Sequence, residues 1–477
     1  MRAVHPVAAI RAAERRLMAQ LPDGTLMQRA AAALAAQCVR SLDRCYGASV
    51  VLLVGGGANG GDALYAGARL ARRGAQVRAV LLQADRAHAG GLAALLAAGG
   101  RATSELDQAM IAAADLVVDG IVGIGGRGDL EGAAADAAAA ARHIRTVAVD
   151  LPSGVDADTG WAGEHAMRAD VTVTFGALKA GLVSGPGTQL AGEVRLVDIG
   201  LDPQLPPSTT CVLESADVAD LLAGPGPGED KYSRGVAGVV AGSSQYPGAG
   251  VLATGAALLG GAGMVRYLGL APDDVQTRYP EIIAHPQARP HEVRVQAWVV
   301  GPGLGTDDAA MSLLTDVLRS DLPVIIDADA ITLVARAPGL IRGRTAPTVL
   351  TPHDREFARI AERPSADRIA SARRAAVDLG ATVLLKGNAT VVAQPSGQVY
   401  VNGTGTPWLA TAGSGDVLSG LIGSLLARGI DAPLAAAVGA HVHGVAGQVA
   451  AADGPPTAMD LLAALRPALA LIMRQRR

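Results

Sequence analysis

The chain has 477 residues, half of them apolar and 18% charged, with a formal net charge of −3. This excludes a disordered chain and allows two or three domains. The small net charge and 3% aromatic content give no basis for a nucleic-acid or anionic-membrane partner. Three scattered cysteines (Cys38, Cys45 and Cys211) are too few for a disulfide framework and fit a reducing cytosol, so we expect a cytoplasmic protein.

Predicted strands and helices alternate along the first 200 residues. Short apolar runs predict strands at 49–55, 76–83, 115–120, 144–150, 170–175 and 194–199, and a helical stretch over 66–74 ends at Gly74. Such alternation indicates a parallel sheet covered on both faces. Ligands of these sheets bind at the carboxyl ends of the strands, so the residues directly after each strand are the candidates for chemistry.

The segment 201–228 holds two proline clusters around a short amphipathic stretch and predicts a domain boundary, giving domains 1–210 and 225–477. After it, strands are predicted at 235–242, 296–301, 323–329, 348–353 and 382–387, a hairpin over 390–403 turning at Ser396-Gly397, and helices at 415–427, 432–452 and 457–474. Both domains are therefore predicted to be α/β, the second with an additional antiparallel ribbon.

One uncharged stretch, between Arg234 and Arg266, is long enough to span a bilayer. Its dense glycines and Pro247 disfavour a continuous helix. We therefore predict a buried strand, a glycine-rich loop and a buried helix there, with no membrane span.

The first candidate site gathers residues that follow three predicted strands. GGGANGGD (55–62) satisfies G-x-G-x-x-G, whose backbone N–H groups approach phosphate at a helix N-terminus. The acidic residue that a dehydrogenase places about 20 positions later is poorly matched by Asp85. The strand ends place Asn59, Asp119, Asp150 and Ser153 at one rim, and oxygen ligands of low total charge suit a hard cation better than zinc.

These residues also have ordinary structural interpretations. The glycines could form a simple turn, and Asp150 or Ser153 could cap a helix. Residue spacing alone leaves both interpretations open.

In this order, GGGANGGD, VVDGIVGIGG, AVDLPSGVD and TFGALKAGL resemble the NAD(P)H-hydrate epimerase family, over most of residues 1–210. The resemblance implies a Rossmann-like three-layer domain in which Asn59, Asp119 and Ser153 hold K⁺. Asp150 is the implied proton shuttle. Lys179 is a weaker candidate whose alternative is an exposed salt bridge, and Ala58 stands where the family usually has asparagine. The implied contacts to the hydrated dinucleotide are Ala58, Asn59, Gly60, Gly61, Asp62, Gly123, Ile124, Gly125, Gly126, Arg127, Gly128, Asp129 and Asp150.

TAGSGDVLSG (411–420) is the strongest motif of the chain. Gly413, Ser414 and Gly415 predict a flexible turn that opens a helix near Asp416, whose N–H groups and dipole can stabilise phosphate charge. Asp416 is placed to act as a base on a substrate hydroxyl. The alternative is that Asp416 is only the helix N-cap.

Other polar residues also follow predicted strands of the second domain. Lys386 opens a glycine turn, and Asp327 and Asp329 are strand-end carboxylates. His441 and His443 lack zinc spacing and point apart on a helix, so we predict core or helix-surface histidines.

SQYPGAG, GPGLG, DADAI, LTPH, KGNAT and AGSGD together resemble the ADP-dependent NAD(P)H-hydrate dehydratase family, which has a ribokinase-like fold, over about 230–475. One departure is PHDRE at 352–356, where the family often has PHPGE. By this resemblance, Ala249, Gly303, His353 and Asp416 contact the hydrated dinucleotide. The adenine nucleotide contacts Lys386, Gly387, Asn388, Ala389, Thr390 and Gly415.

The sequence thus predicts a two-domain α/β enzyme that epimerises and dehydrates NADHX and NADPHX, the hydrated forms of NADH and NADPH. Expected cofactors are K⁺ in the first domain and Mg²⁺ with ADP or ATP in the second, and we expect a homo-oligomer. One alternative is a ribokinase-like vitamin-precursor kinase. Another is that residues 1–210 only bind a nucleotide or a protein partner.

Overall fold

The computed structural model describes residues 1–222, 224, 226, 228 and 230–476. They form two compact units: a first unit of Ala3–Ser208, and a second unit of Met1–Arg2 with Thr209 and the residues that follow. Positions 223, 225 and 227 of the predicted boundary, and the predicted domain ends 225 and 477, lie outside the described residues. Within the boundary, β9 (Thr210–Val212) and α8 (Ser215–Leu221) are folded and belong to the second unit.

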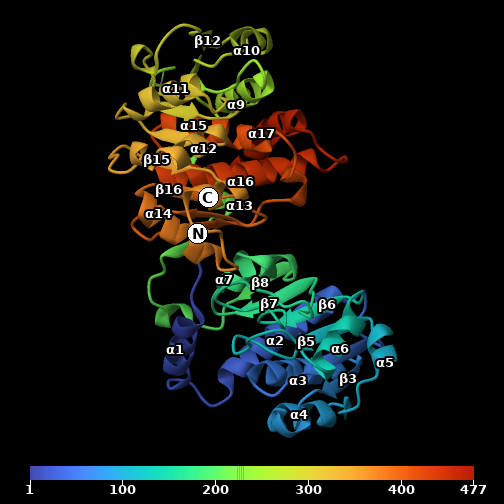
Figure 1. Ribbon diagram of the computed structural model, residues 1–477. Coiled ribbons are helices and arrows are strands. Elements are labelled where there is room, and N and C mark those ends of the chain that lie inside the picture. Colours follow the sequence, from blue (N-terminus) through green and yellow to red (C-terminus); the bar gives the residue numbers. More distant parts are fainter. Residues whose placement is uncertain (223, 225, 227, 229, 477) are drawn as a thin grey trace. The chain divides into compact units, whose positions relative to one another are not determined.

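The first unit is built on a parallel sheet of seven strands in the order β4-β3-β2-β5-β6-β7-β8 (Figure 1). The six predicted strands are confirmed. The sequence analysis missed β4, a short strand that is largely exposed and so lacks an apolar run. The strands are β2 (Ser49–Val54), β3 (Gln76–Leu81), β4 (Arg101–Thr103), β5 (Leu116–Gly120), β6 (Thr146–Val149), β7 (Val171–Phe175) and β8 (Glu193–Val197).

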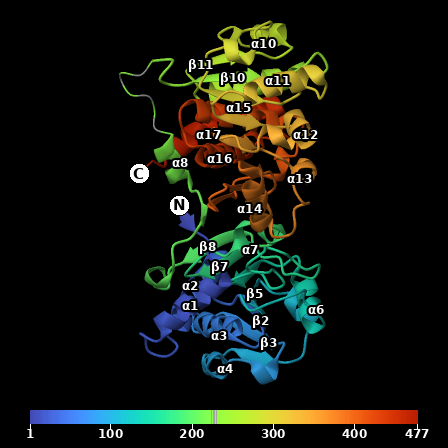
Figure 2. The same ribbon diagram turned by 60° about the vertical axis from the view of Figure 1, so that its left-hand side comes forward.

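Helices cover both faces of this sheet (Figure 2). Alternate side chains of β2 explain why: Val50 and Leu52 pack with residues of α2 and α3, whereas Val51 and Leu53 pack with residues of α5 and α6. The predicted helix over 66–74 is the second half of α3. The helices are α1 (Val7–Met18), α2 (Thr25–Ser41), α3 (Ala58–Ala71), α4 (Ala89–Ala97), α5 (Gln108–Ala112), α6 (Ala133–Ala141) and α7 (Ala180–Val183).

The second unit has an eleven-stranded sheet in the order β1-β9-β18-β17-β16-β15-β14-β13-β10-β11-β12. The predicted antiparallel hairpin is confirmed as β17 and β18, and β16 also pairs antiparallel with β17. The further strands are β1 (Arg2–Ala3), β10 (Val236–Val240), β11 (Met264–Tyr267), β12 (Ile283–Ala284), β13 (Ala297–Val300), β14 (Val324–Ile326), β15 (Thr348–Leu350), β16 (Thr382–Leu385), β17 (Thr390–Ala393) and β18 (Val399–Asn402).

The three predicted C-terminal helices are confirmed, and they pack together with α9. Gly420 lets α15 approach α9, because a Cβ at that position would lie 2.0 Å from the main-chain oxygen of Ala253. Besides α8, the helices are α9 (Pro247–Leu259), α10 (Pro272–Arg278), α11 (Asp308–Leu318), α12 (Asp329–Arg336), α13 (Asp354–Ile360), α14 (Arg368–Leu379), α15 (Ser414–Ala427), α16 (Ala432–Ala450) and α17 (Ala458–Met473).

The uncharged stretch between Arg234 and Arg266 forms β10, α9 and the first half of β11, so it is not one continuous helix. Among the residues that the structure describes, no helix has both the length and the apolar character to cross a membrane.

The packing of β2 generates a stability prediction. Leu52 is fully buried, so Leu52→Ala leaves a cavity and should cost about 3 kcal/mol of unfolding free energy. Hydrogen exchange should then show about a hundredfold loss of protection at the β2 amides, since 1.4 kcal/mol corresponds to a factor of ten. Leu96→Ala, at a half-exposed helix position of the same unit, is the control and should change stability by less than about 0.5 kcal/mol.

Candidate functional site

Each sheet has a point between parallel strands where its strand order reverses, and a glycine-rich loop follows the strand at that point. In the first unit β2 lies between β3 and β5, and GGGANGGD follows β2. In the second unit β10 lies between β11 and β13, and SQYPGAG follows β10. Open α/β sheets bind ligands in the crevice at such a switch point, so each unit has a candidate site at the carboxyl end of its sheet.

Asp150 and Lys179 form a buried ion pair where β6 and β7 end. Lys179 Nζ lies 2.5 Å from Asp150 Oδ1, and the lysine side chain is 1% exposed. The same oxygen accepts hydrogen bonds from Thr174 Oγ1 and Phe175 N. The alternative of an exposed lysine is therefore wrong. No helix begins between Asp150 and Ser153, so the alternative that these residues cap a helix is wrong as well.

The residues predicted to hold potassium come together at the end of β5. Asp119 is fully buried, and it accepts hydrogen bonds from Ser153 Oγ at 2.6 Å and from Ser153 N at 2.8 Å. Asn59 donates from Nδ2 to Val149 O, and a Cβ on Gly123 would lie 2.6 Å from Asn59 Oδ1. Burial raises the pKa of Asp119 to about 6, although its hydrogen bonds to Ser153 act in the opposite direction.

Asp62 is a buried carboxyl beside this centre. Its Oδ1 has no hydrogen-bond partner among the described residues. Asn59 and Asp62 share a face of α3, because residues three apart on a helix are neighbours, and Asn59 contacts the residue that precedes Asp150. Burial, followed by the charges of Asp150 and Glu14, raises the pKa of Asp62 to about 8. At neutral pH a protonated carboxyl therefore lies near the Asp150–Lys179 pair.

The predicted substrate loop 123–129 follows β5 and lines a cavity of about 150 Å³. Arg127 pairs with Asp156 at 2.5 Å, and Asp129 lies 2.9 Å from His165 Nδ1. These two side chains fasten the loop to the segment that contains Asp156 and His165. Ligand pockets usually measure about 300–1,000 Å³, so the cavity can enclose only part of a dinucleotide.

In the second unit, Asp327 is the centre of a buried polar cluster at the end of β14. Lys386 Nζ lies 2.7 Å from Asp327 Oδ1, and Ser419 Oγ donates to Asp327 Oδ2 at 2.6 Å. Although burial opposes it, the charges of Asp327 and Glu356 raise the pKa of Lys386. A cation is thereby held at the start of the predicted nucleotide-binding segment.

Asp416 lies in the first turn of α15, close to this cluster. The helix begins at Ser414, one residue earlier than predicted, and Gly413 is its N-cap in a left-handed conformation with φ 86°. The alternative in which Asp416 is the N-cap is therefore wrong. Burial and then the charge of Asp327 raise the pKa of Asp416 to about 7, while Lys386 lowers it. A carboxyl with this pKa can accept a proton near neutral pH.

The predicted nucleotide-binding residues 386–390 connect β16 to β17. Thr390 Oγ1 donates to Gly387 O at 3.3 Å and closes the turn. A Cβ on Gly415 would lie 3.2 Å from Lys386 Nζ, so the structure brings these two predicted residues together. Asn388 is exposed, whereas Ala389 is buried.

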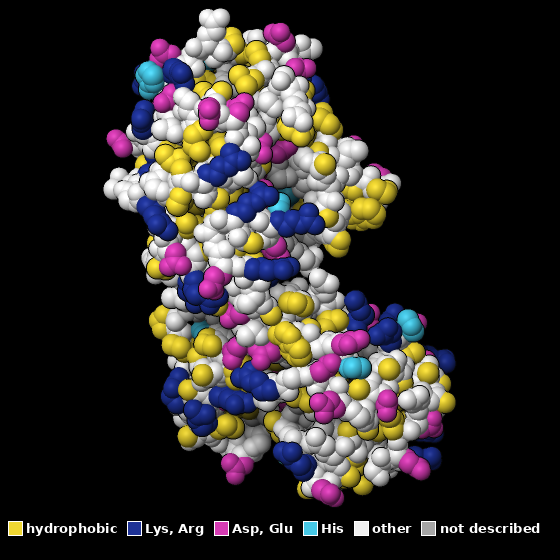
Figure 3. Space-filling view, viewed as in Figure 1, with side chains coloured by type: hydrophobic (Ala, Val, Ile, Leu, Met, Phe, Trp, Pro, Cys, Tyr) yellow, Lys and Arg dark blue, Asp and Glu magenta, His cyan; other side chains and the backbone are white. Residues whose placement is uncertain are grey.

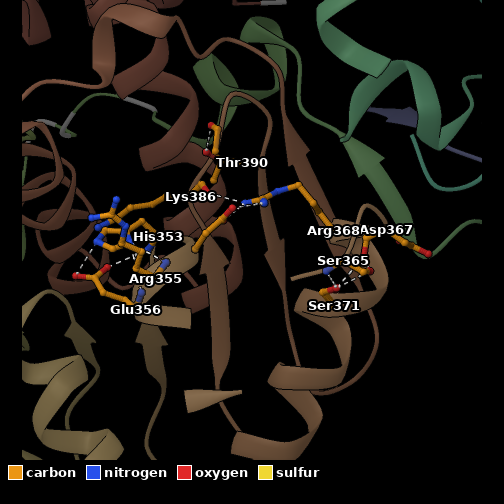
Figure 4. A network of polar contacts seen from close by, with 11 residues as sticks. His353, Arg355, Glu356, Ser365, Asp367, Arg368, Ser371, Lys386 and Thr390 are labelled. Atoms are coloured by element: carbon orange, nitrogen blue, oxygen red, sulfur yellow. Dashed lines mark hydrogen bonds and ion pairs between the residues drawn. The ribbon is translucent and has the colours of Figure 1, made fainter. Parts of the chain in front are cut away.

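Of the other predicted dinucleotide contacts, Ala249 and His353 lie at the starts of helices, and Gly303 lies in the loop after β13. A Cβ on Gly303 would lie 2.7 Å from Ala249 Cβ near the beginning of α9. His353 is the N-cap of α13 and accepts from the main-chain N–H of Glu356 (Figure 4). Its side chain is 51% exposed and so accessible to a ligand.

The other histidines singled out in the sequence are core residues, as predicted. His441 and His443 are buried, and their rings contact Ser215 and Ser414 respectively. Burial lowers the pKa of both to about 4. The described residues contain no group of three or more His, Cys, Asp or Glu that could hold a metal ion.

Asp327 is one of the strand-end carboxylates that the sequence marked, but its pairing with Lys386 was not predicted. Ser419 and Arg368 were not singled out, although Ser419 lies inside TAGSGDVLSG and the motif could have marked it. Arg368, which contacts the nucleotide segment, stands in no motif. In the view of Figure 3, basic side chains gather over α12 and α13, a surface that suits a phosphate-bearing ligand.

Two family models match the chain. The one described as NAD(P)H-hydrate dehydratase matches residues 237–467, and the one described as YjeF-related protein N-terminus matches residues 23–181. The bifunctional NAD(P)H-hydrate repair enzyme Nnr of Mycobacterium leprae is 51% identical and covers 99% of this chain and 100% of its own. The enzyme of the same name from Mycobacterium tuberculosis is 53% identical over 92% of each chain.

Solved structures match the second unit. The ADP/ATP-dependent NAD(P)H-hydrate dehydratase from Bacillus subtilis, co-crystallised with ATP/Mg²⁺, is 28% identical with a TM-score of 0.50, over 54% of this chain and 97% of its own. A ribokinase-like superfamily protein from Enterococcus faecalis is 26% identical with a TM-score of 0.50, over 56% and 98%. The predicted ribokinase-like α/β fold is thus confirmed.

The charges around Asp416 generate a prediction. Lys386→Met removes the cation that lowers the pKa of Asp416, so that pKa should rise above its value of about 7. Carbon-13 NMR of aspartate-labelled protein measures it, with the Asp416 signal assigned from its loss in Asp416→Asn. Arg374→Met, at an exposed position of α14, is the control and should leave the titration unchanged. An unchanged midpoint in Lys386→Met would contradict the prediction.

Proposed function

The chain belongs to the family of bifunctional NAD(P)H-hydrate repair enzymes, and we propose that it performs both reactions of that name, one in each unit. The first unit interconverts the R and S epimers of NADHX and NADPHX. The second dehydrates the S epimer with ADP or ATP. The observation that carries the proposal is that the two motif sets fold into two polar centres, each organised around a lysine–aspartate ion pair.

In the first unit, two carboxyl groups at one centre have different surroundings. Asp150 is paired with the Lys179 ammonium group, whereas burial raises the pKa of Asp62 to about 8. We assign Asp150 to proton transfer at the hydroxyl-bearing C6 of the nicotinamide ring, where epimerisation must break and remake a bond. Asp62 belongs to the α3 start that contacts the substrate, together with residues 58–61.

The donor set at the end of β5 fits potassium. Asn59 and Ser153 offer neutral oxygens, and Asp119 offers one buried carboxylate that also accepts hydrogen bonds from Ser153. One negative charge among neutral oxygens suits a monovalent hard cation. When bound, K⁺ would supply positive charge beside the substrate loop.

In the second unit, the substrate hydroxyl is a poor leaving group and must first be phosphorylated. Asp416 accepts the hydroxyl proton while the hydroxyl oxygen bonds to the terminal phosphorus of ADP or ATP, and the nucleotide leaves one phosphate shorter. Lys386 and the N–H groups of the first turn of α15 stabilise the charge on the phosphoryl group. The new phosphate ester then leaves as inorganic phosphate, the ring loses a proton from the adjacent carbon, and the double bond of NAD(P)H returns.

Magnesium fits the charge around Asp416. Asp327, Asp329 and Glu356 all raise the pKa of Asp416, so the site holds more negative charge than Lys386 compensates. Carboxylates and phosphates together are the usual surroundings of Mg²⁺ in nucleotide sites. Bound with the nucleotide near Asp329 and Glu356, Mg²⁺ would neutralise phosphate charge.

Asp416→Asn should abolish dehydration and leave epimerisation intact. Loss of the base should lower kcat by at least about a hundredfold. In the unsubstituted protein, kcat/KM for dehydration should rise with pH through about 7, because only ionised Asp416 accepts the proton. NADH absorbance follows dehydration, and chromatography of the R and S epimers follows epimerisation. Loss of both activities in Asp416→Asn, or phosphorylation of an unrelated alcohol with NADHX untouched, would overturn the assignment.

Asp150→Asn should give the opposite result. Epimerisation should fall by about a hundredfold or more, since the proton-transferring group is lost, while dehydration of purified S epimer continues. Replacing K⁺ by choline in the buffer should also slow epimerisation alone. Asp85→Asn, an exposed residue at the position where a dehydrogenase would place its acidic side chain, is the control. Equal epimerisation in Asp150→Asn and the control would reject the role of Asp150.

A further inference from the structure

Arg368, the first residue of α14, joins two segments of the second unit that are far apart in sequence (Figure 4). Its Nη1 and Nη2 lie 3.1 and 2.8 Å from the two carboxylate oxygens of Asp354. Nη2 also donates to the main-chain oxygen of Lys386 at 2.7 Å. The arginine side chain is 14% exposed, so its guanidinium group is held on both sides by these contacts.

The two segments belong to different halves of the proposed site. Asp354 opens α13 directly after His353, a proposed dinucleotide contact. Lys386 opens the segment 386–390, which is proposed to bind the adenine nucleotide. A Cβ on Gly387 would lie 3.0 Å from Arg368 Nη2, so the guanidinium group packs against the backbone of this segment. The position of the nucleotide segment is therefore tied to the position of α13.

The contact between Arg368 and Asp354 contributes too little to stability for fold stabilisation to be its main role. The Asp354 side chain is 58% exposed, and exposed ion pairs contribute little to stability because water screens them. A bidentate pair nevertheless fixes geometry, since the planar guanidinium group matches both carboxylate oxygens.

We propose that Arg368 is a positioning residue that couples nucleotide binding to dinucleotide binding in the second unit. The proposal rests on the proposed function for the identity of the two ligands. A nucleotide that binds segment 386–390 fixes the position of that segment. The contacts of Arg368 with Lys386 and Asp354 then fix the position of α13 and of His353 at its start. Coupling is reciprocal, so each ligand strengthens the binding of the other by the same factor.

Product binding to the full chain tests the coupling without turnover. The fluorescence of NADH measures its affinity with and without AMP, and AMP affinity is measured with and without NADH. In the unsubstituted protein, each ligand should tighten the other by about fivefold or more. Arg368→Met and Asp354→Asn should reduce this factor towards one, and Asp354→Asn should raise KM for ADP more than it lowers kcat.

Two further variants make the result decisive. Arg368→Lys keeps the charge but lacks the planar fork, so it should also lose most of the coupling. Arg374→Met removes an exposed arginine from the same helix, and this variant should keep the full coupling between the two ligands. Thermal melting checks that each variant folds. If Arg368→Met fails to fold, the coupling measured in Asp354→Asn and Arg368→Lys tests the proposal.

The proposal is overturned if NADH and AMP bind independently in the unsubstituted protein, or if Asp354→Asn and Arg368→Lys keep the coupling of Arg374→Met. Failure of the proposed function looks different. In that case NADHX is not converted by any form of the protein, whatever the binding measurements show.

Discussion

Lys179 lies 2.5 Å from Asp150 in the first unit and Lys386 lies 2.7 Å from Asp327 in the second, each pair at the carboxyl end of a parallel sheet. Removing two charges from water costs several kcal/mol per ion, so such pairs persist only with good geometry and additional hydrogen bonds. Thr174 and Phe175 supply those bonds to the first pair, and Ser419 supplies one to the second. The first pair thereby connects the residues that follow β6 and β7, and the second connects the residues that follow β14 and β16.

Backbone strain accompanies both pairs. Asp150 (φ 67°) and Ala328 (φ 49°), which follows Asp327, are the non-glycine residues with positive φ in the described part of the chain. Each such conformation costs about 1–3 kcal/mol and survives only where its surroundings hold it. Here the lysine contacts hold the adjacent carboxylates in place. The strain is therefore part of how each site is formed before a ligand binds.

The same construction leads to different proton chemistry in the two units. In the first, Asp150 is paired with Lys179, while burial raises the pKa of the neighbouring Asp62 to about 8. In the second, Asp416 sits among other carboxylates but also near Lys386, and its pKa is about 7. Environments that push carboxyl pKa values apart are how one residue type serves several roles. The proposed division of labour between the units depends on this difference.

The sequence by itself determined most of the strands, because apolar runs such as 49–55 are local and must be buried, and it determined the motifs that follow them, whereas short strands such as β4 carry no such run. It also marked Asn59, Asp119 and Ser153, because the ends of parallel strands meet at one edge. Only the tertiary structure decided that Lys179 is enclosed, that Gly413 rather than Asp416 caps α15, and that Arg368 reaches Lys386. These facts depend on contacts between distant segments and on burial, which shifts the pKa of a carboxyl group according to neighbours that residue spacing along the chain does not reveal.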